Sequence, residues 1–498
     1  MRGADIRGHS LRAIALGAAL VALYLPTPAS ASSIGLNPAS MARVGTIDPR
    51  FLSYNIEMVE VTGGRFWRPY RNGVPPLFAH RKPIDLTNAR LRKLAAALGP
   101  AYLRVSGTWA NATWFNNRGG HAKVPTGFTD ELTRAQWKGV IEFARAVDAR
   151  LVTSFATSKG TRDAQGAWTP AQASQLIGYT HAVGGEIAAA EFTNEPDGGD
   201  AANFGRDLAT FRTWLKQASP NTLLLGPGAT SGDGPDDAQT GEHLLSAAGP
   251  VFDAISWHYY GGASQRCSHE VQSAAAREQT ALSEGRLSKA DRVERIYADL
   301  RDRFEPGKPL WITETAAAYC GGNPWDATFL DSFRYLDQLG RMARHGVQVV
   351  MHNTLAASDY GLLNETNFAP RPDYWAALLW RRLMGTTVLD PGPSPALGLN
   401  LYAHCLRDKP GGVVLLAINT DRSASTTLEL PTAASRYTLT AAHLTDASVR
   451  LNGSLLKLGA HDELPPLKAD SASPGRIDLA PASITFLAVP DAANPACL

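Results

Sequence analysis

Two glutamates stand at the ends of apolar, strand-like segments, where a lone carboxylate needs a chemical reason. Glu314 is the only charged residue in "PLWITETAAAYCGG" (309–322), and Glu195 lies in "EFTNEPD" (191–197), followed by the strand-ending Pro196. Burying an unpaired carboxylate is costly or shifts its pKa upward. Two carboxyl groups ~5–5.5 Å apart across a sugar are the nucleophile and the acid/base of a retaining glycosidase.

Each glutamate taken alone has a simpler interpretation. Asn-Glu-Pro is a common turn tripeptide, and Thr-Glu-Thr can cap a helix. Their joint placement favours catalysis, because Glu195 and Glu314 end the fourth and the seventh of eight predicted strands. In a closed barrel these two positions face each other across the mouth. The pair also predicts that repulsion raises the pKa of one carboxyl above the ~4.3 of a free glutamate, which keeps the acid protonated.

The elements that would position this pair alternate between strands and helices from Phe51 to about Gly385. The predicted strands are "FLSYNIE", "AYLRVSGTW", "RLVTSFATS", "EIAAAEFTNEP", "NTLLLGPGAT", "FDAISWHYY", "PLWITETA" and "VQVVMHNTL". Helices are predicted over 129–148, 169–183, 204–218, 287–303 and 326–345. Continuous apolar strands separated by helices are typical of parallel sheets. The pattern predicts an α/β fold, a (β/α)₈ TIM barrel over residues 51–385.

The pattern changes after Gly385. Short strand-like segments separated by Gly, Pro, Asp and Ser predict an antiparallel β-sandwich over residues 386–498, to which residues 32–50 add a strand. Residues 1–31 have flanking arginines, an apolar run and Ala29-Ser30-Ala31, which is typical of a cleaved signal peptide. We therefore expect a secreted or periplasmic protein that has no membrane association after cleavage.

Composition narrows the function classes. Of the 498 residues, 44% are hydrophobic and 19% charged, as in an ordinary globular protein. The net charge of +2 comes from the signal segment, so the remaining chain lacks the basic field of a nucleic-acid-binding protein. His258 and His352 end strands, but such histidines more often orient carboxylates or contact sugar hydroxyls than bind metal. We predict no metal, no cofactor, no nucleic-acid partner and a monomer.

Four cysteines, Cys267, Cys320, Cys405 and Cys497, are an even number in a chain expected to be exported. This favours two disulfides, for which three pairings are possible. No Cys-x-x-Cys motif is present, so the spacing does not indicate a structural zinc site. No Gly-x-Ser-x-Gly elbow is present either, which argues against a serine hydrolase.

The sequences of several segments resemble those of a known family. "FLSYNIE", "YLRVSGTW", "EFTNEPD", "WITETAAAYCGG" and "PDYWAALLWRRLMGTTVL" read, in this order, like segments of glycoside hydrolase family 79, the heparanases and related β-glucuronidases. The likeness runs from about Phe51 to the C-terminus. It implies retaining cleavage of a β-linked glucuronate in an anionic polysaccharide, with Glu195 as acid/base and Glu314 as nucleophile.

The resemblance also implies substrate contacts. Asn194 would bind the sugar 2-hydroxyl, and Tyr319 and Tyr360 would hold the glucuronate carboxylate. Backbone N–H groups that follow Tyr319 would help them. The remaining positions expected to bind substrate are Glu57, Thr108, His258, Cys320 and Gly321. Without the resemblance, packing would be the preferred interpretation of Tyr319 and Tyr360.

Two departures from the family pattern carry predictions. Where the family usually has Tyr-Gly-Gly, this chain has Tyr319-Cys320-Gly321-Gly322. We expect Cys320 to pair with Cys267, because both lie on loops at the barrel mouth, while Cys405 and Cys497 match the family's sandwich disulfide. No additional linker stands between the first and third strands, so we expect a single-chain enzyme active without proteolysis.

The substrate polymer is only weakly indicated. In "TGGRFWRPYRNG" (62–73), Arg65, Arg68 and Arg71 alternate with aromatic residues, and Lys159, Arg162 and Arg266 follow other strands. Arginines near a cleft can bind sulfate, which favours endo cleavage of heparan sulfate. The alternatives are a solvated loop packed on its own aromatics, an exo-β-glucuronidase, and a non-catalytic glycan-binding protein. The last would have lost one of the two glutamates, yet both are present.

Overall fold

The computed structural model describes residues 33–70, 76–231, 235–267, 277–393 and 396–498. The predicted signal peptide (1–31) and Arg71 lie outside these ranges. In the described part of the chain, no helix is both long enough and apolar enough to cross a bilayer.

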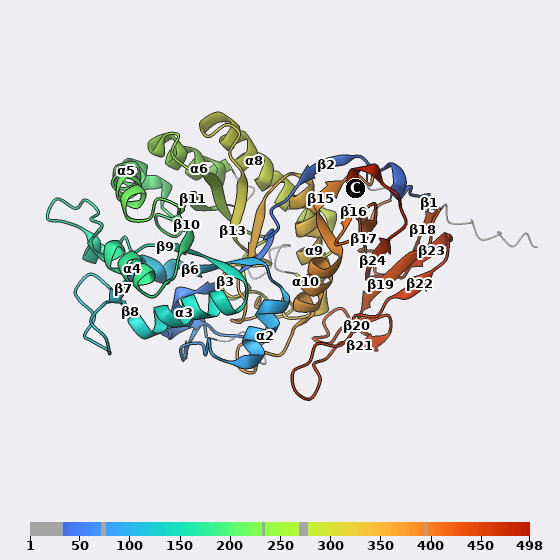
Figure 1. Cartoon of the computed structure of the whole chain (residues 1–498), viewed down its shortest axis with the longest axis horizontal. Helices are drawn as coiled ribbons and strands as arrows, with labels where there is room; N and C mark the ends of the chain where they lie inside the picture. Colours follow the sequence, from blue (N-terminus) through green and yellow to red (C-terminus); the bar gives the residue numbers. More distant parts are fainter. Residues whose placement is uncertain (1–32, 71–75, 232–234, 268–276, 394–395) are drawn as a thin grey trace, which may run out of the picture. The chain divides into compact units, whose positions relative to one another are not determined.

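Eight parallel strands close into a barrel (Figure 1). In chain order they are β3 Leu52–Glu57, β6 Ala101–Ser106, β9 Ala149–Ser154, β10 Ile187–Glu191, β11 Leu223–Ser231, β12 Ala254–Tyr260, β13 Leu310–Ala316 and β14 Val349–His352. Every predicted strand segment overlaps one of them; β9 begins one residue before its segment, and β11 ends one residue after its segment. The predicted TIM barrel is confirmed, and Glu195 and Glu314 belong to its fourth and seventh units.

Helices follow most of the barrel strands. They are α1 Met58–Thr62, α2 Ala89–Ala97, α3 Arg134–Ala146, α4 Ala171–Ala182, α5 Ala201–Ala218, α6 Pro235–Ala248, α7 Glu284–Leu287, α8 Lys289–Phe304, α9 Phe329–Arg344 and α10 Pro372–Leu383. The helix expected from Thr129 begins instead at Arg134, because Thr133 and Gln136 form a capping box there. The residues before it form β8 (Asp130–Thr133), which pairs with β7 (Thr113–Asn116).

The barrel interior changes from apolar to polar along its axis. Near the N-terminal ends of the strands, side chains from seven strands pack together; they are Tyr102, Val152, Ala189, Leu225, Ala254, Trp311, Val349 and Met351. Two residues further along five of these strands, the inward positions are polar; they are Arg104, Ser154, Glu191, Ser256 and Thr313. Because side chains alternate with a period of two, each strand supplies both layers. The apolar layer supports a polar layer directly beneath the mouth.

Apart from β7, β8 and the separate two-stranded sheet of β4 (Gly64–Trp67) and β5 (Phe78–Arg81), the remaining strands form sheets around the C-terminal part of the chain. Their bounds are β1 Ile34–Gly35, β2 Arg43–Thr46, β15 Met384–Leu389, β16 Leu399–Leu406, β17 Val413–Asn419, β18 Thr426–Leu430, β19 Ala434–Thr440, β20 Arg450–Leu451, β21 Ser454–Leu455, β22 Asp470–Ala472, β23 Gly475–Leu479 and β24 Ser483–Val489. A larger sheet runs β2-β15-β16-β17-β24-β19-β20-β21, and β1-β18-β23 form a smaller one. In Figure 1 the blue β1 and β2 lie among the orange and red C-terminal strands.

The larger sheet buries both of its faces, as β17 illustrates. Val414, Leu416 and Ile418 pack into the main core with barrel helices, whereas Leu415 and its neighbours pack against the smaller sheet. This alternation is that of a buried antiparallel strand. The predicted β domain with antiparallel strands is therefore present. The limits at residues 50 and 385 stay a prediction, and β15 begins at Met384.

One buried carboxylate joins the barrel to the larger sheet. Asp337 of α9 accepts hydrogen bonds from Asn400 Nδ2 at 2.7 Å and Tyr402 Oη at 2.6 Å, both on β16. Arg341 Nε, one turn further along α9, donates to the same carboxylate at 2.6 Å. All three donors would lose their acceptor together if this side chain were removed.

We predict that Asp337→Ala lowers the free energy of unfolding by about 3 kcal/mol, because it leaves the buried Asn400 and Tyr402 donors without their acceptor and removes one of the three carboxylates paired with Arg341. Thermal and denaturant unfolding measure the effect. Lys138→Ala is the control, since Lys138 forms only an exposed pair with Glu142 and should change stability by less than ~0.5 kcal/mol. Equal stabilities of the two variants would contradict the prediction.

Candidate active site

A β-bulge turns Glu314 into the barrel. Along β12 and β13 the paired residues are Trp257 with Ile312 and then His258 with Glu314, so that Thr313 is left as the additional residue. Strict alternation would send Thr313 and Glu314 to opposite faces, but both side chains point inward and bind polar partners there. The bulge thus adds an inward carboxylate above the polar layer.

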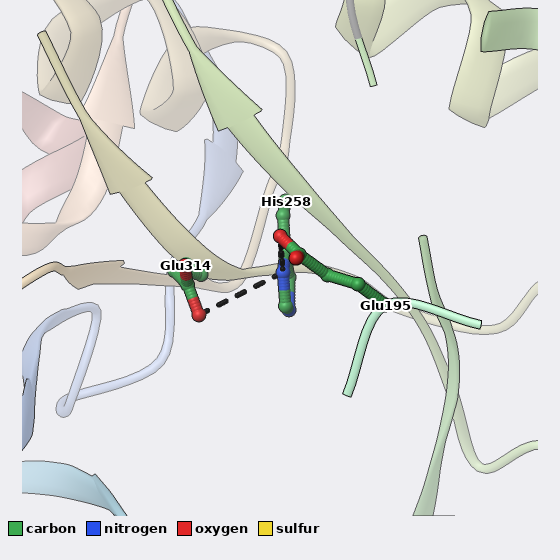
Figure 2. Close-up of side chains that lie close together, drawn as sticks. All are labelled: Glu195, His258 and Glu314. Atoms are coloured by element: carbon green, nitrogen blue, oxygen red, sulfur yellow. Dashed lines mark hydrogen bonds and ion pairs between the residues drawn. The ribbon is translucent and has the colours of Figure 1, made fainter. Parts of the chain in front are cut away.

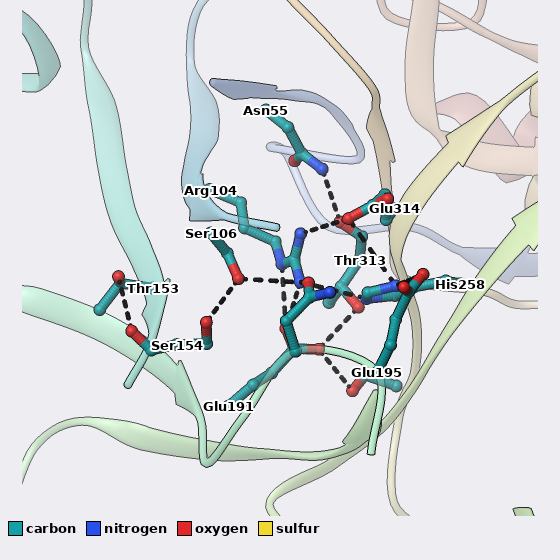
Figure 3. Close-up of polar contacts among 12 residues, drawn as sticks. Asn55, Arg104, Ser106, Thr153, Ser154, Glu191, Glu195, His258, Thr313 and Glu314 are labelled. Carbon is teal, nitrogen blue, oxygen red and sulfur yellow. Dashed lines mark hydrogen bonds and ion pairs between the residues drawn. The ribbon is translucent and has the colours of Figure 1, made fainter. Parts of the chain in front are cut away.

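Arg104 occupies the centre of this polar layer (Figure 3). It donates from Nε to Glu191 Oε2 at 2.9 Å and from Nη1 to Glu314 Oε2 at 2.8 Å. Its Nη2 lies 2.8 Å from Asn194 Oδ1 and 3.1 Å from His258 Nε2. Burial opposes the charge, but the Glu191 and Glu314 carboxylates raise the pKa of Arg104, so it remains a cation. One guanidinium therefore fixes four side chains from the ends of three strands, β10, β12 and β13.

Glu191 is the buried counter-ion of Arg104. Its Oε1 accepts hydrogen bonds from Ser256 Oγ at 2.9 Å and Thr313 Oγ1 at 2.7 Å. Burial favours the neutral acid, but the Arg104 charge outweighs it and holds the pKa of Glu191 below its usual range. Glu191 therefore stays ionised and is fully engaged beneath the site, away from the mouth.

The two predicted catalytic carboxyl groups meet at His258 (Figure 2). His258 Nδ1 lies 3.0 Å from Glu195 Oε1 and 3.7 Å from Glu314 Oε2. One oxygen of each glutamate and the imidazole nitrogen all lie within 4.8 Å of one another. The Glu314 side chain is 7% exposed and that of Glu195 27% exposed, so Glu195 is the more accessible of the two. The pairing expected from strands four and seven is present in space.

The tautomer of His258 follows from Arg104. A guanidinium can only donate, so His258 Nε2 must carry the lone pair and Nδ1 the proton. Burial opposes a charge on the ring, whereas the Glu314 carboxylate raises the pKa of His258. A doubly protonated ring would nevertheless set an N–H group against the Arg104 cation. His258 is therefore best described as a neutral imidazole that donates from Nδ1 to Glu195.

The prediction that repulsion raises the pKa of the acid, Glu195, is wrong. Burial alone would raise the pKa of Glu195, but the hydrogen bond from His258 Nδ1 holds it below its usual range. Repulsion from Glu314 does not prevail, because His258 and Arg104 lie beside the pair and stabilise the carboxylate form. Glu195 thus favours the ionised state that accepts a proton.

Glu314 is held from two sides. Besides Arg104, Tyr260 Oη donates to its Oε1 at 2.5 Å, and Asn353 Nδ2 in turn donates to that phenol oxygen at 2.9 Å. Asn353 Nδ2 also lies 3.1 Å from Glu57 Oε1. Burial, and next the Glu314 charge, raise the pKa of Glu57 well above its usual range, so that this residue is a neutral acid. Its Oε2 has no hydrogen-bond partner in the described part of the chain.

Asn111 holds the backbone that carries the acid/base candidate. Its Oδ1 accepts from Asn194 N at 2.9 Å, and its Nδ2 donates to Asn194 O at 2.8 Å. The next residue, Glu195, has a φ of +49°, which L-residues adopt only at a cost of about 1 kcal/mol or more. Asn111 bonds both the N–H and the C=O of Asn194, the residue before Glu195, and so supports this strained conformation.

The loop after β13 turns its carbonyl groups inward. Tyr319 O accepts from Ser264 N at 3.1 Å, Gly321 O from Ser358 Oγ at 2.8 Å, and Gly322 O from Ser264 Oγ at 2.6 Å. The N–H groups of Cys320, Gly321 and Gly322 have no acceptor among the residues described. Consecutive free N–H groups beside a cleft can bind an anion.

Glycine is required within this loop. Gly321 has a φ of +84°, and a Cβ there would lie 2.4 Å from Trp67 Cβ and 2.5 Å from Ser358 Oγ.

The other predicted binding residues differ in exposure. The Tyr319 ring is 45% exposed, Tyr360 is buried at 1%, and Thr108 is exposed on the segment that follows β6.

Two of the arginines expected at the cleft already have internal partners. Arg162 Nη1 donates to Asp207 Oδ2 at 2.7 Å, and Arg266 Nη2 donates to Asp359 Oδ2 at 3.0 Å. The Arg266 side chain is only 1% exposed. Arg65, Arg68 and Lys159 are exposed, whereas Phe66 packs under their loop against Trp109. Of the described cations expected to bind sulfate, Arg65, Arg68 and Lys159 therefore remain available to a substrate.

Both predicted disulfides are present. Cys267 bonds to Cys320, joining the loops after β12 and β13, and Cys405 bonds to Cys497, joining β16 to the chain end. The structure thus selects one of the three pairings that the cysteine count allowed.

The same three central residues could in principle hold a cation. The ligand atoms of Glu195, His258 and Glu314 lie close enough together, within 4.8 Å. However, His258 Nε2 already accepts from Arg104, so coordination through Nδ1 would require an imidazolate. The donor set does not suit a metal, and the absence of metal and cofactor stays a prediction.

Arg104, Glu191, Asn111, Tyr260 and Asn353 were not assigned to the site from the sequence. For Arg104 and Glu191 the sequence does contain a feature that could have indicated a role in the site. Arg104 and Glu191 are charged residues within buried strands, which is the same feature that drew attention to Glu314. Asn111 lies in a 3₁₀ segment after β6 and has no such signal.

Comparison with known proteins identifies the family. The family model described as "Glycosyl hydrolase family 79, N-terminal domain" matches residues 82–340, just over half of the chain. The chain belongs to glycoside hydrolase family 79.

Relatives of this family 79 chain are similar over most of its length. Heparanase of Bos taurus is 28% identical over 91% of this chain and 90% of its own. Hyaluronoglucuronidase of Hirudo nipponia is 27% identical over 83% and 92%. Among solved structures, the 4-O-α-L-rhamnosyl-β-D-glucuronidase of Fusarium oxysporum has a TM-score of 0.65 at 15% identity, covering 92% of this chain and 100% of its own. That structure shows the shared fold alone.

We predict that Arg104→Lys lowers glycosidase activity at least about 100-fold, because a lysine cannot reach Glu191, Glu314 and Asn194 together. Steady-state kinetics and thermal unfolding measure the effect. Arg381→Lys is the matched control. Arg381 is also buried, but among the described residues its side-chain hydrogen bonds go only to the carbonyl groups of Pro49, Leu52 and Pro100. It should lose stability while keeping kcat; similar kcat losses in both variants would contradict the role of Arg104.

Proposed function

We propose that this family 79 chain is a retaining glycosidase that cleaves β-linked glucuronic acid, acting as an endo-β-glucuronidase on heparan sulfate. The proposal is carried by the carboxyl oxygens of Glu195 and Glu314, which lie within 4.8 Å of each other. Retaining enzymes have carboxyl groups ~5–5.5 Å apart, whereas inverting enzymes need ~6.5–9.5 Å to admit a water molecule. The close spacing supports retention.

Glu314 is the proposed nucleophile. Its two oxygens are oriented by Arg104 and Tyr260, so the carboxylate is fixed before substrate arrives. Attack on the anomeric carbon breaks the glycosidic bond and forms a glycosyl ester. Glu195 donates a proton to the departing oxygen in this step and takes one from water in the next. The more accessible position of Glu195 suits both proton transfers.

Glucuronate recognition is assigned to the Tyr319–Gly322 loop. The three N–H groups without an acceptor in the described chain form a place for a carboxylate, with Tyr319 beside them. Asn194 and Glu57 would contact sugar hydroxyls, as would Thr108. Tyr360 is a buried phenol whose pKa is raised well above its usual range by burial, so it would donate as a neutral group.

Endo cleavage of heparan sulfate is supported by similarity to heparanases over nine-tenths of the chain and by the exposed Arg65, Arg68 and Lys159. A specific observation favours exo cleavage of a less sulfated glycan as the second candidate, because Arg162 and Arg266 are paired internally. Sizing the products from heparan sulfate and from unsulfated hyaluronan separates them: early shortening of the polymer indicates endo action, and release of monosaccharide indicates exo action.

Export is proposed on separate grounds. Two disulfides form and persist in oxidising compartments. The described residues contain no helix that could span a membrane. The disulfides support a secreted or periplasmic enzyme, and the monomeric state is retained as an expectation.

Covalent trapping tests the retaining mechanism. A cyclophellitol-type glucuronide probe should form one ester, at Glu314, because only a nucleophilic carboxylate opens its ring. Mass spectrometry of peptides locates the adduct, and Glu314→Gln is the unlabelled control. Glu195→Gln should lose activity on glycans but keep much of it on aryl glucuronides with good leaving groups. Modification of another residue in the native enzyme would disprove the assignment.

The lowered pKa of Glu195 predicts an acidic optimum. The acid step needs protonated Glu195, so kcat/KM on a glycan should fall about tenfold for each pH unit above that pKa. The kcat/KM for an activated aryl glucuronide should fall less over the same pH range. His258→Ala removes the hydrogen bond that lowers this pKa, and so should move the alkaline limb to higher pH. A limb that does not move would exclude His258 from this role.

A further inference from the structure

Arg266 connects four neighbouring loops at the barrel mouth. The guanidinium donates to Asp359 in the loop after β14, to Arg68 O in the loop after β3, and, at 3.5 Å, to Gly322 O in the loop after β13. Arg266 itself follows β12. These four strands are adjacent in the barrel, so one buried side chain ties a continuous half of the rim.

The residues that contact Arg266 also contact one another. Its guanidinium lies over the Tyr70 ring at 4.1 Å, and Tyr70 N donates to Asp359 Oδ2 at 2.9 Å. Tyr70 Oη lies 3.0 Å from Ser264 Oγ, which binds Gly322 O. Arginine's planar fork can serve an ion pair, a carbonyl and an aromatic face together, which lysine cannot. Removing Arg266 would take away its bonds to three of these loops and leave only the direct contacts between the loops to hold them.

The next residue supplies a second, covalent tether to the same loop. Cys267 is bonded to Cys320, which lies between Tyr319 and Gly321. Cys320 has a φ of +63°, a conformation that a residue with a Cβ rarely adopts without support. The segment with the free N–H groups is thus held at one end by a hydrogen bond from Arg266 to Gly322 O and in its middle by the disulfide of the adjacent residue.

We infer that Arg266 and the Cys267–Cys320 disulfide form a two-part clasp that holds the Tyr319–Gly322 loop in its carboxylate-binding form. Arg266 is a positioning residue, because it acts through the loop and is too buried to meet substrate. The clasp determines selectivity for a uronate over a neutral sugar, while the chemistry at Glu195 and Glu314 is left intact. This inference rests on the proposed glucuronidase function.

The test compares two probes on the full-length protein. One is the cyclophellitol-type glucuronide, and the other carries a hydroxymethyl group in place of the carboxylate. In Arg266→Gln and in the double variant C267S/C320S, the inactivation efficiency of the glucuronide probe should fall about tenfold, through weaker binding. The efficiency of the neutral probe should stay near that of the native enzyme. R266K should lie between native and R266Q.

Matched controls separate the clasp from general stability. Arg162→Gln removes another arginine–aspartate pair at a strand end, and C405S/C497S removes the other disulfide. Both should keep the native preference between probes, whatever their thermal unfolding midpoints. For the strain at residue 320, C267S/C320G should recover part of the loss seen in C267S/C320S, because glycine adopts a positive φ freely.

The outcomes are distinguishable. A native enzyme that reacts equally with both probes would overturn the proposed glucuronidase function itself. A native enzyme that prefers the glucuronide, together with clasp variants that keep this preference, would overturn the clasp alone. Equal losses on both probes in R266Q and C267S/C320S would assign these residues to general stability and also overturn it.

Discussion

The burial of the Arg104 cation inside the barrel is the constraint on which the site depends. A guanidinium taken out of water must be compensated by carboxylates and hydrogen-bond acceptors with good geometry. Glu191 supplies a permanent counter-ion below it, and Glu314, Asn194 and His258 take its remaining N–H groups. Moving any of these acceptors would leave part of the charge unpaired. The need to satisfy one cation therefore fixes the nucleophile candidate, the tautomer of the histidine and the amide beside the acid/base candidate.

The barrel meets this constraint through an irregularity in one strand. Regular alternation supplies a single inward layer at each height, in which Glu191 pairs with Arg104 and accepts a hydrogen bond from Thr313. The bulge at Thr313 adds Glu314 to the same side, so Arg104 has a carboxylate on each side. Bulges are common beside active sites because they redirect one side chain without unpairing the whole strand. Here the redirected side chain is the proposed nucleophile.

The sequence was sufficient for the barrel and for the pairing of Glu195 with Glu314, because both depend on strand order, which apolar segments reveal. The Cys267–Cys320 bond could be expected for the same reason, since its cysteines follow adjacent strands. Arg104 was missed because a charge inside a strand does not show which way its side chain points. The pKa of Glu195 was predicted in the wrong direction because repulsion from Glu314 could be foreseen, whereas the donor that outweighs it could not. His258 donates only because Arg104 occupies its other nitrogen, and that contact joins residues 154 positions apart.

The two glutamates are held in different ways, which matches the different work proposed for them. Glu314 receives a donor on each oxygen, from strands β6 and β12, and is almost fully buried. Such a carboxylate can approach an anomeric carbon in only one orientation, as a nucleophile must. Glu195 lies beyond the strand end and has one histidine contact and greater exposure. An acid/base must meet first a leaving oxygen and then a water molecule at slightly different positions, which a side chain clamped as firmly as Glu314 could not do. The asymmetry in support therefore favours the assignment of Glu314 as nucleophile and Glu195 as acid/base, on grounds independent of the family resemblance.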